Sequence, residues 1–469
     1  MTVFSMTIRQ EHREELGSLL TADDGAERAA YLLCGQCVVA RDPWDGRARR
    51  KFLSVEVMPI PPSEVLSASP LHVTWQSSFH LKALARARAE GLIPVIVHIH
   101  PGGASEFSPQ DDANEADLWR LGANRDGDGH EFGSLLFGGA GDVSARIWRR
   151  GVPDAFDSVT AIGDRLALSY GGRGRGMTGE AFARQALAFG DALNGDLRRL
   201  RVGVVGCGGT GSAVAMLLAR LGVGQIALFD EDVVERTNLN RLHGTRQADA
   251  DAMRPKVQAV AASIAEMGLG VRAIPFRGWI GDPALRDALK SCDVLFGCTD
   301  DHDGRMLLNR FAAFYLVPVI DIGLAAEVSQ GPVPLMTALD GRVTWLFPGN
   351  SCLLCRSVVD PAKAHAESLR RSNPTEYEMR KREAYVAGEG NPAPAVVTFT
   401  TELACMAVNE LIERLHGFRR CGTAANRVRQ FHLLEDRRPG AKADPHCPVC
   451  GSDAYWGRGD VEPFLDRVG

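Results

Sequence analysis

Two histidines, a serine and an aspartate near residue 100 have the types and spacing of a metal site. His98 and His100 end the apolar run VIVHIH and point to one face of a predicted strand, because side chains alternate along a strand. Seven residues separate His100 from Ser108, and Asp111 follows three positions later. Two imidazoles and a carboxylate leave the fourth position of tetrahedral zinc to water, whose pKa falls toward about 7. The pattern therefore predicts a catalytic zinc ion held by His98, His100 and Asp111.

Ser108 and Asp111 also fit the start of a helix over 108–122. Ser108 can cap it, Pro109 suits its first position, and Asp111 can close a capping box. Capping accounts for these residues but leaves the two histidines unexplained. Both roles can coexist, so the metal interpretation stands beside the cap.

A second pattern, RVGVVGCGGTG (201–211), places four glycines between a predicted strand and a predicted helix. They are Gly206, Gly208, Gly209 and Gly211. Glycine permits the tight turn through which backbone N–H groups approach a phosphate at a helix N-terminus. Asp230 ends the next predicted strand, where a carboxylate can bind ribose hydroxyls. Alone, this pattern fits NAD, FAD and ATP enzymes, and a structural turn is the other alternative.

The residues that follow the glycine turn distinguish between these alternatives, because they resemble a known family that uses ATP. They form the series DEDVVERTNLNRLHG (230–244), RPKV (254–257) and GCTDDHDGRMLLN (297–309). Attack of a carboxylate on the α-phosphate places negative charge on phosphoryl oxygens, which arginine, lysine and Mg²⁺ stabilise. A hydride-transfer site would not need that many cations.

This series resembles the ThiF/MoeB-type adenylating domain of ubiquitin-activating and sulfur-carrier-activating enzymes, over 180–350 and more weakly toward 455. The resemblance implies ATP and Mg²⁺ as cofactors. Its implied site residues are Asp230 for the ribose, Asn238, Arg241 and Lys256 for the phosphates, and Asp300 for Mg²⁺. It also implies that Arg184, in FARQALAFG, reaches the ATP of the other subunit in a homodimer. Solvated basic side chains are the plain alternative for Arg184, Arg241 and Lys256.

The string H-x-H-x7-S-x2-D, from His98 to Asp111, resembles the JAMM/MPN-plus motif of deubiquitinating metallo-isopeptidases. That resemblance implies an upstream glutamate as general acid/base. Glu27 fits its place near the start of an Ala/Leu-rich helix, AERAAYLLCG (26–35). It further implies that Ser108 helps to polarise the scissile carbonyl.

Six of the eleven cysteines form three CxxC pairs. Cys352, Cys355, Cys447 and Cys450 have the spacing of two zinc knuckles, and four thiolates give a closed, structural zinc site. Disulfides are disfavoured in the cytoplasm. The remaining pair, Cys34 and Cys37, is interpreted as core or loop cysteines.

The crossing segment 356–395 is polar and mostly aperiodic, and is predicted to be long and partly mobile. Conjugating members of the adenylating family carry a nucleophilic cysteine there, but 356–404 contains none. Three acceptors of the activated carboxylate remain open: an external thiol of a conjugating enzyme or sulfur donor, Cys405, or a hydroxyl. The candidate hydroxyls belong to Ser368, Ser372 and Thr375.

The elements that position these residues form two α/β modules. AERAAYLLC (26–34) has helical spacing, whereas FLSVEVM and GLIPVIVHIH are predicted strands. From residue 201, strands alternate with helices, which favours a Rossmann-like, mostly parallel sheet. The expected divisions are a JAMM-type α/β metalloprotease domain at 1–155, a Gly-rich linker at 156–180, an adenylating domain at 181–350, and a crossing segment, helix and zinc-clipped tail at 351–469.

Composition excludes some function classes. A net charge of −5 gives no reason to expect nucleic acid or an anionic membrane as partner. The N-terminus lacks an apolar signal segment, and the run GLIPVIVHI is too short to span a bilayer, so a cytoplasmic protein is expected.

The whole pattern predicts a bifunctional enzyme that adenylates and trims or deconjugates a ubiquitin-like protein ending in Gly. Two alternatives stay open: activation of a sulfur carrier for biosynthesis, and an inactive scaffold for a ubiquitin-like protein and a conjugating enzyme.

Overall fold

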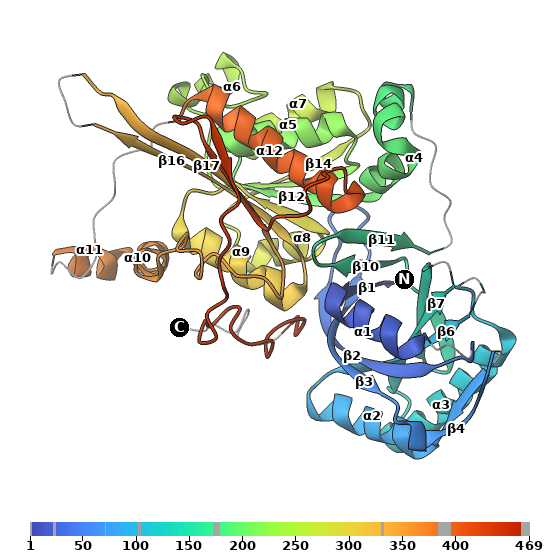
Figure 1. The fold of residues 1–469 in the computed structure, drawn as a ribbon. Coiled ribbons are helices and arrows are strands. Elements are labelled where there is room, and N and C mark those ends of the chain that lie inside the picture. The colour runs from blue at the N-terminus through green and yellow to red at the C-terminus, as the bar shows by residue number, and fades with distance from the viewer. Residues whose placement is uncertain are drawn as a thin grey trace.

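The computed structural model describes most of the 469 residues. The described ranges are 2–21, 25–70, 72–101, 103, 105–139, 141–171, 179–329, 333–382 and 395–460. They form two large sheets and one two-stranded sheet, β4 (Val65–Ser69) with β5 (His72–Trp75). Helices lie on both faces of each large sheet (Figure 1), so the α/β prediction is confirmed.

The first sheet has nine strands in the order β11-β10-β1-β3-β2-β6-β7-β8-β9. Their bounds are β1 Val3–Arg9, β2 Ala29–Val39, β3 Arg49–Pro59, β6 Ile93–His100, β7 Glu131–Gly138, β8 Val143–Arg149, β9 Val152–Ala155, β10 Ser158–Ile162 and β11 Leu166–Tyr170. Helix α1 (Gln10–Leu20) packs on one face, while α2 (Ser77–Ala89) and α3 (Pro109–Asp126) pack on the other. Because both faces are covered, alternate side chains of β2 enter different clusters, Leu32 beside α1 and Tyr31 beside α2.

The helix predicted over 26–34 is wrong. Most of this interval belongs to β2, which lies between β3 and β6. All side chains from Ala30 to Cys34 are buried. A strand buried on both faces is a continuous apolar run, and its spacing does not distinguish it from a buried helix.

The second sheet has eight strands in the order β14-β13-β12-β15-β16-β17-β18-β19. Its strands are β12 Arg201–Val205, β13 Gln225–Asp230, β14 Arg272–Arg277, β15 Val294–Gly297, β16 Val319–Val328, β17 Met336–Leu346, β18 Asn426–Gln430 and β19 Glu435–Arg437. The first five are parallel, as predicted, and the last three add antiparallel pairs. The order reverses at β12, which lies between β13 and β15, and in open parallel sheets ligands bind at the carboxyl ends of the strands at such a reversal.

The helices of the second module complete two covering layers. They are α4 Ala183–Arg199, α5 Gly209–Leu221, α6 Gln247–Asp251, α7 Lys256–Glu266, α8 Arg286–Lys290, α9 His302–Tyr315, α10 Pro361–Ser372, α11 Pro374–Arg382 and α12 Val397–His416. Short 3-10 turns are η1 Pro62–Glu64, η2 Glu180–Phe182, η3 Arg236–Asn238 and η4 Pro283–Leu285. In Figure 1, α5, α7 and α12 cover one face of the sheet, and α8 and α9 cover the other.

Two predicted connections differ from the structure. The first half of the 156–180 linker forms β10 and β11, which extend the first sheet as far as Tyr170. Residues 172–178, the glycine-rich centre, lie outside the described residues. The crossing segment carries α10 and α11, which its polar composition concealed because both helices bury little apolar surface. Its later part, 383–394, also lies outside the described residues.

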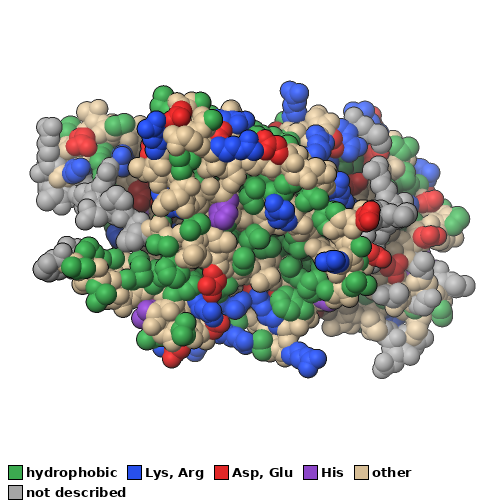
Figure 2. Space-filling model, turned by 90° about the horizontal axis from the view of Figure 1, so that it is seen from above, with side chains coloured by type: hydrophobic (Ala, Val, Ile, Leu, Met, Phe, Trp, Pro, Cys, Tyr) green, Lys and Arg blue, Asp and Glu red, His purple; other side chains and the backbone are tan. Residues whose placement is uncertain are grey.

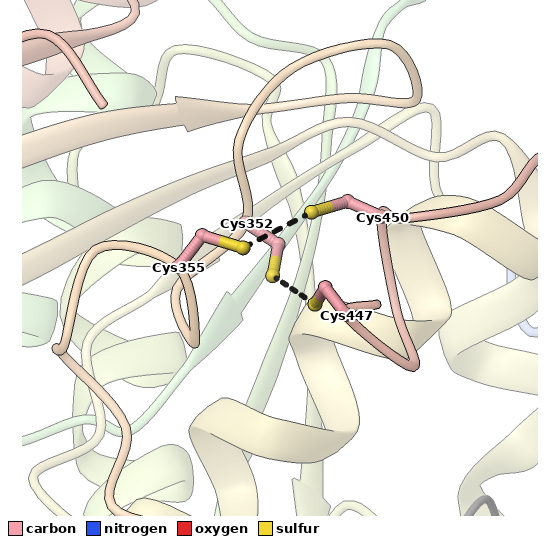
Figure 3. A group of neighbouring side chains, drawn as sticks. All are labelled: Cys352, Cys355, Cys447 and Cys450. Carbon is pink, nitrogen blue, oxygen red and sulfur yellow. Dashed lines mark hydrogen bonds between the residues drawn. The ribbon is translucent and has the colours of Figure 1, made fainter. Parts of the chain in front are cut away.

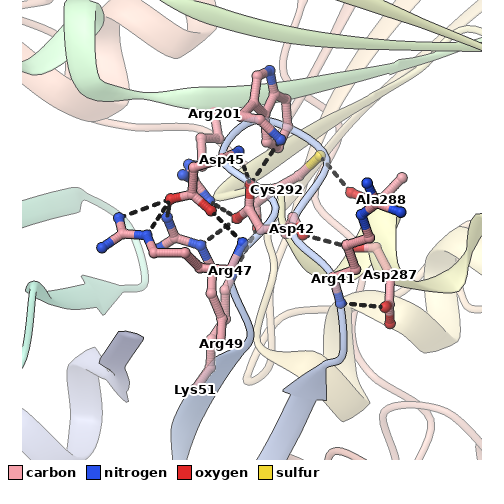
Figure 4. A network of polar contacts seen from close by, with 12 residues as sticks. Arg41, Asp42, Asp45, Arg47, Arg49, Lys51, Arg201, Asp287, Ala288 and Cys292 are labelled. Atoms are coloured by element: carbon pink, nitrogen blue, oxygen red, sulfur yellow. Dashed lines mark hydrogen bonds and ion pairs between the residues drawn. The ribbon is translucent and has the colours of Figure 1, made fainter. Parts of the chain in front are cut away.

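The two modules share one hydrophobic core. Five buried side chains of the first module, Cys37, Trp44, Leu53, Ile162 and Leu166, belong to the same cluster as the strands of the second sheet. Beside this core, the fully buried carboxylate of Asp42 pairs with Arg49 of its own module and with Arg201 of β12 (Figure 4). Lys51 Nζ donates to the carbonyl of Cys292 at 2.9 Å. The modules are therefore joined by packing and by buried polar contacts.

None of the helices in the described parts of the chain is long and apolar enough to cross a membrane. Figure 2 shows hydrophobic side chains gathered across the middle of the face seen from above, with charged side chains around them. At the end of the β16–β17 hairpin, Val333 and Leu335 are 78% and 67% exposed.

Asp42→Asn tests whether the modules unfold together. The substitution removes the fully buried carboxylate that pairs with Arg201 and leaves the buried Arg49 with Asp45 alone, and we expect a loss of about 3–5 kcal/mol in unfolding free energy. Asp45→Asn is the matched control, because Asp45 pairs with Arg47 and Arg49 at a more exposed position and should cost less than about 1 kcal/mol. Denaturant unfolding followed by fluorescence should show one transition that shifts only in Asp42→Asn. Two separate transitions in the unsubstituted protein would contradict a shared core.

Candidate active sites

The glycine turn joins β12 to α5 and brings the backbone close to its neighbours. Gly206 has φ of +86°, and a Cβ there would lie 2.9 Å from the carbonyl carbon of Cys298. A Cβ at Gly211 would overlap the carbonyl oxygen of Gly206. Gly208 caps α5, which begins at Gly209, so the free N–H groups of its first turn are available to a phosphate.

Asp230 lies at the end of β13, directly against this turn. Its carboxylate accepts from the backbone N–H of Cys207 at 2.6 Å and from that of Asp232 at 2.8 Å. Burial raises the pKa of Asp230, and the nearby ammonium of Lys256 opposes that rise. Both carboxylate oxygens face backbone donors, which fixes the side chain at the edge where a ribose would lie.

Lys256 and Arg241 bring positive charge to the same edge. Lys256 begins α7, and its Nζ lies 2.7 Å from Asp232. Burial lowers the pKa of Lys256, but Asp230 and Asp232 outweigh burial and the net shift is upward, so the ammonium is retained. Arg241 lies over the glycine turn, since its Cδ is 3.5 Å from the Cβ position of Gly209. Asn238 is buried, and its Oδ1 accepts from Glu235, which holds the turn that carries Arg241.

Asp300 lies in the turn after β15, next to the glycine turn that contacts Cys298 and Thr299. It is exposed, whereas its neighbour Asp301 caps α9 through Gly304. The crossing segment lies next to the start of α9, because Arg371 of α10 pairs with Asp303 at 2.6 Å. Asp300 is therefore the carboxylate of this turn that faces outward.

The structure also brings His98, His100 and Asp111 together. Their ligand atoms lie within 4.8 Å of one another. His98 Nε2 is 3.3 Å from Asp111 Oδ1, and His100 Nε2 is 3.4 Å from Asp111 Oδ2. His98 Nε2 is buried and has no hydrogen-bond partner of acceptable geometry, as fits a nitrogen directed at a cation. This donor set fits zinc.

Ser108 and Asp111 form the predicted cap without losing the metal geometry. Ser108 caps α3, its Oγ accepts from the backbone N–H of Asp111, and its backbone N–H donates to Asp111 Oδ2 at 2.7 Å. Burial raises the pKa of Asp111, but His98 and the Ser108 hydrogen bonds outweigh burial and hold the pKa below its usual range. The carboxylate is therefore ionised, as a metal ligand requires.

Glu27 lies beside this cluster, although it precedes β2 and not a helix. Its Oε1 is 3.9 Å from His100 Nε2, and the residue is 6% exposed. Burial raises the pKa of Glu27 to about 7, opposed by His98 and reinforced by Asp111. A carboxyl that titrates near neutral pH suits a group that both accepts and returns a proton.

The four predicted knuckle cysteines form one cluster, drawn in Figure 3. Cys352 and Cys447 have their sulfurs 3.5 Å apart, and Cys355 and Cys450 have theirs 3.4 Å apart. A tetrahedral zinc with Zn–S bonds of about 2.3 Å places its sulfurs about 3.8 Å apart. The arrangement fits a closed structural site that ties the tail to the loop after β17.

The tail that follows the cysteines passes between the two modules, which the sequence did not indicate. Asp460 accepts from Lys290 Nζ at 2.8 Å and from the hydroxyl of Tyr315 at 3.0 Å, both in the second module. In the first module, the backbone N–H of Val38 donates to the same carboxylate, and the N–H of Asp460 donates to the carbonyl of Gln36.

The remaining residues that the sequence singled out lie outside these three clusters. Cys34 and Cys37 are fully buried, as expected for core cysteines. Arg184 is exposed on α4, and its role toward a partner subunit stays a prediction. Asp232 was not predicted as a site residue, although it stands in the DEDV stretch two residues after Asp230.

A model of the ThiF family matches residues 182–451, more than half of the chain, and the chain therefore belongs to the ThiF family. Residues 1–181 lie outside the match. Among curated relatives, the SAMP-activating enzyme E1 of Haloferax volcanii is 30% identical over 161 residues, covering 34% of this chain and 54% of that protein.

Two further relatives are adenylyltransferases by name. The molybdopterin-synthase adenylyltransferase of Escherichia coli is 27% identical over 250 residues, 51% of this chain and 95% of that enzyme. The adenylyltransferase and sulfurtransferase MOCS3 of Sus scrofa is 36% identical over 195 residues, 40% of this chain and 38% of that protein. The chain thus spans about half of the first relative and less than half of the third.

Loss of the cysteine cluster should loosen the tail selectively. In a Cys447→Ser/Cys450→Ser variant, we expect faster hydrogen exchange at the Val38 amide, which donates to Asp460. The Arg41 amide is an internal control, because it donates to Asp287 independently of the tail. Exchange resolved to single amides by fragmentation checks this. Equal acceleration at both amides would show general loosening and not release of the tail.

Proposed function

We propose that the ThiF-family module uses ATP and Mg²⁺ to adenylate the C-terminal carboxylate of a small ubiquitin-like or sulfur-carrier protein. The observation that carries the proposal is that Asp230, Arg241 and Lys256 lie at the glycine turn of β12, and that Asp300 follows Thr299, which lies next to that turn. In this proposal the four side chains serve the ribose, the phosphates and magnesium at the carboxyl edge of the parallel strands. The family membership supports the same chemistry.

Each residue has a separate task in this proposal. The N–H groups at Gly208 and Gly209 and the side chains of Arg241, Lys256 and Asn238 bind phosphates. Asp230 orients the ribose, and Asp300 holds the magnesium ion that is used in adenylation. As the partner's carboxylate attacks the α-phosphorus, the preorganised cations stabilise charge on the phosphoryl oxygens and pyrophosphate leaves.

The relatives favour a sulfur-carrier type of partner over a conjugated one. One relative is named for molybdopterin synthase, and another for both adenylyltransferase and sulfurtransferase activity. The exposed apolar tip of the β16–β17 hairpin supports a protein partner, since exposed hydrophobic patches mark interaction surfaces. A homodimer, with Arg184 reaching the other subunit's ATP, belongs to the same proposal.

The acceptor of the activated carboxylate is proposed to be an external thiol. Cys405 is only partly exposed and lies in the third turn of α12, one turn after Thr401, whose hydroxyl is 2.9 Å from His243 Nε2. Ser368 and Ser372 lie on α10, where the Ser372 hydroxyl is bound to the carbonyl of Ser368. An external donor thiol needs no rearrangement of these helices.

Partner-dependent ATP–pyrophosphate exchange tests the adenylation. With a small β-grasp protein that ends in Gly, we expect exchange that falls about 100–1000-fold in Lys256→Ala, because one phosphate-binding cation is lost. Lys363→Ala, at an exposed position on α10, is the control and should keep full exchange. If ATP–pyrophosphate exchange persists in Lys256→Ala, Lys256 does not have the proposed phosphate-binding role. No exchange with any such partner would instead favour a scaffold.

A second function is proposed for the first module: zinc-dependent cleavage of a peptide or isopeptide bond at the same kind of C-terminal tail. It is supported by the cluster of His98, His100 and Asp111 with Glu27 beside it. Such a JAMM-type activity would trim a precursor to its terminal glycine or release finished products. The two modules would then act on one substrate class.

The chain's own groups would divide the hydrolytic work. Bound zinc would supply the Lewis acidity that lowers the pKa of water. Glu27 would take a proton from the attacking water and return it to the leaving amine, which its pKa near 7 permits. Ser108 lies within reach of the same site and would donate to the scissile carbonyl oxygen when its bond to Asp111 is exchanged.

Glu27→Gln separates hydrolysis from metal binding. The amide keeps the shape of the side chain but cannot accept a proton, so we expect hydrolysis of a tail-extended partner to fall about 100–10,000-fold. Zinc content, measured by elemental analysis, should stay the same. His100→Ala is the complementary control and should lose both zinc and hydrolysis. Hydrolysis that survives Glu27→Gln would assign the proton transfer to another group.

A further inference from the structure

A buried network links β8 to the first turn of α3, which carries Asp111. Arg146 of β8 donates through Nε to Glu115 Oε2 at 2.8 Å and through Nη1 to Asp112. Glu115 also accepts from Ser134 Oγ of β7 at 2.6 Å. Arg146 and Glu115 are only 7% and 4% exposed, so this fork is held in a low-dielectric environment.

The same arginine holds an aromatic side chain against the metal cluster. Its guanidinium carbon lies 3.8 Å from the ring centroid of Phe107, the residue before the Ser108 cap. The Phe107 ring in turn lies 6.2 Å from the ring of His98. Arg146 therefore contacts the chain on both sides of Ser108: Phe107 before it, and Asp112 and Glu115 after it.

Phe107 and Arg146 also form part of the wall of a cleft of about 1220 Å³. The cleft runs along residues of β8, β10 and β11 and reaches Arg199 of α4. Phe107 therefore lies both in the wall of this cleft and next to His98, with Arg146 against its ring.

We propose that Arg146 is a positioning residue of the N-terminal zinc site, which sets Asp111 and His98 for the metal without touching it. The inference rests on the proposed zinc function. Ligand atoms must lie within about 0.2 Å of their ideal places, and residues that orient ligands typically change metal affinity 10–100-fold when lost. Arg146 also neutralises Glu115, but its contacts with Asp112 and Phe107 extend beyond that pair.

Zinc affinity of the full-length protein, measured by competition with a chromophoric chelator, tests this. The unsubstituted chain should hold two zinc ions, and His98→Ala should hold one. In Arg146→Met we expect the affinity of the weaker site to fall about 10–100-fold while the cysteine-bound zinc stays. Arg146→Lys should show a similar loss, because an ammonium cannot make the same fork.

Arg149→Met is the matched control on the same strand. Arg149 also lies over an aromatic ring, Phe4 at 4.5 Å, and also pairs with a carboxylate, Asp154, but neither belongs to α3. Zinc affinity should not change in this variant. Unchanged affinity in Arg146→Met, or an equal loss in both variants, would overturn the positioning role.

Two further variants separate positioning from charge balance and from misfolding. Arg146→Met/Glu115→Gln removes the unpaired buried carboxylate, and we expect zinc affinity to stay low; full recovery would overturn the proposal. Phe107→Ala leaves the Arg146–Glu115 pair in place, and it should still weaken zinc binding even if Arg146→Met does not fold. A chain that holds one zinc ion, with no change in His98→Ala, would instead reject the N-terminal zinc function itself.

Discussion

The buried carboxylate of Asp42, shared by Arg49 and Arg201, fixes one end of the strand on which the proposed nucleotide site depends. Arg201 is the first residue of β12, and five residues later the same strand enters the glycine turn. A strand of that length spans roughly 17 Å and bends little when it is flanked on both sides. Because β12 is paired with β13 and β15, a fixed starting point also fixes the turn, and the first module thereby supports the site of the second.

Parallel pairing explains why residues from distant parts of the chain meet at this turn. The ends of β12, β13 and β15 lie side by side, so Gly206, Asp230 and Asp300 follow neighbouring strands although nearly a hundred residues separate the first from the last. Asp230 is the link between them, since it accepts from the backbone of Cys207. Burial of this carboxylate is tolerable because Lys256 lies close to it and backbone donors surround it.

Residues whose function depends on local spacing were predictable, whereas those whose function depends on long-range contacts were not. The glycine turn, the cap at Ser108 and the CxxC pairs are each defined by short spacing, and the structure places each as expected. The helix expected around Glu27 was wrong because the buried strand β2 has no distinguishing period. Arg146 and Asp460 belong to no motif. They contact residues more than thirty positions away, and the spacing of residues along the chain does not predict such pairs.

A rigid joint between the modules constrains how one substrate would meet both proposed sites. The shared core, the Asp42 pairs and the tail at Asp460 hold the first sheet against the second, so neither site is free to swing toward the other. A folded partner protein would therefore have to dissociate and rebind, or present a flexible tail long enough to reach each site in turn. A flexible C-terminal tail is what both reactions require, since adenylation needs a free carboxylate and hydrolysis needs an extended peptide. The rigid joint thus favours sequential use of a released tail over direct transfer between the sites.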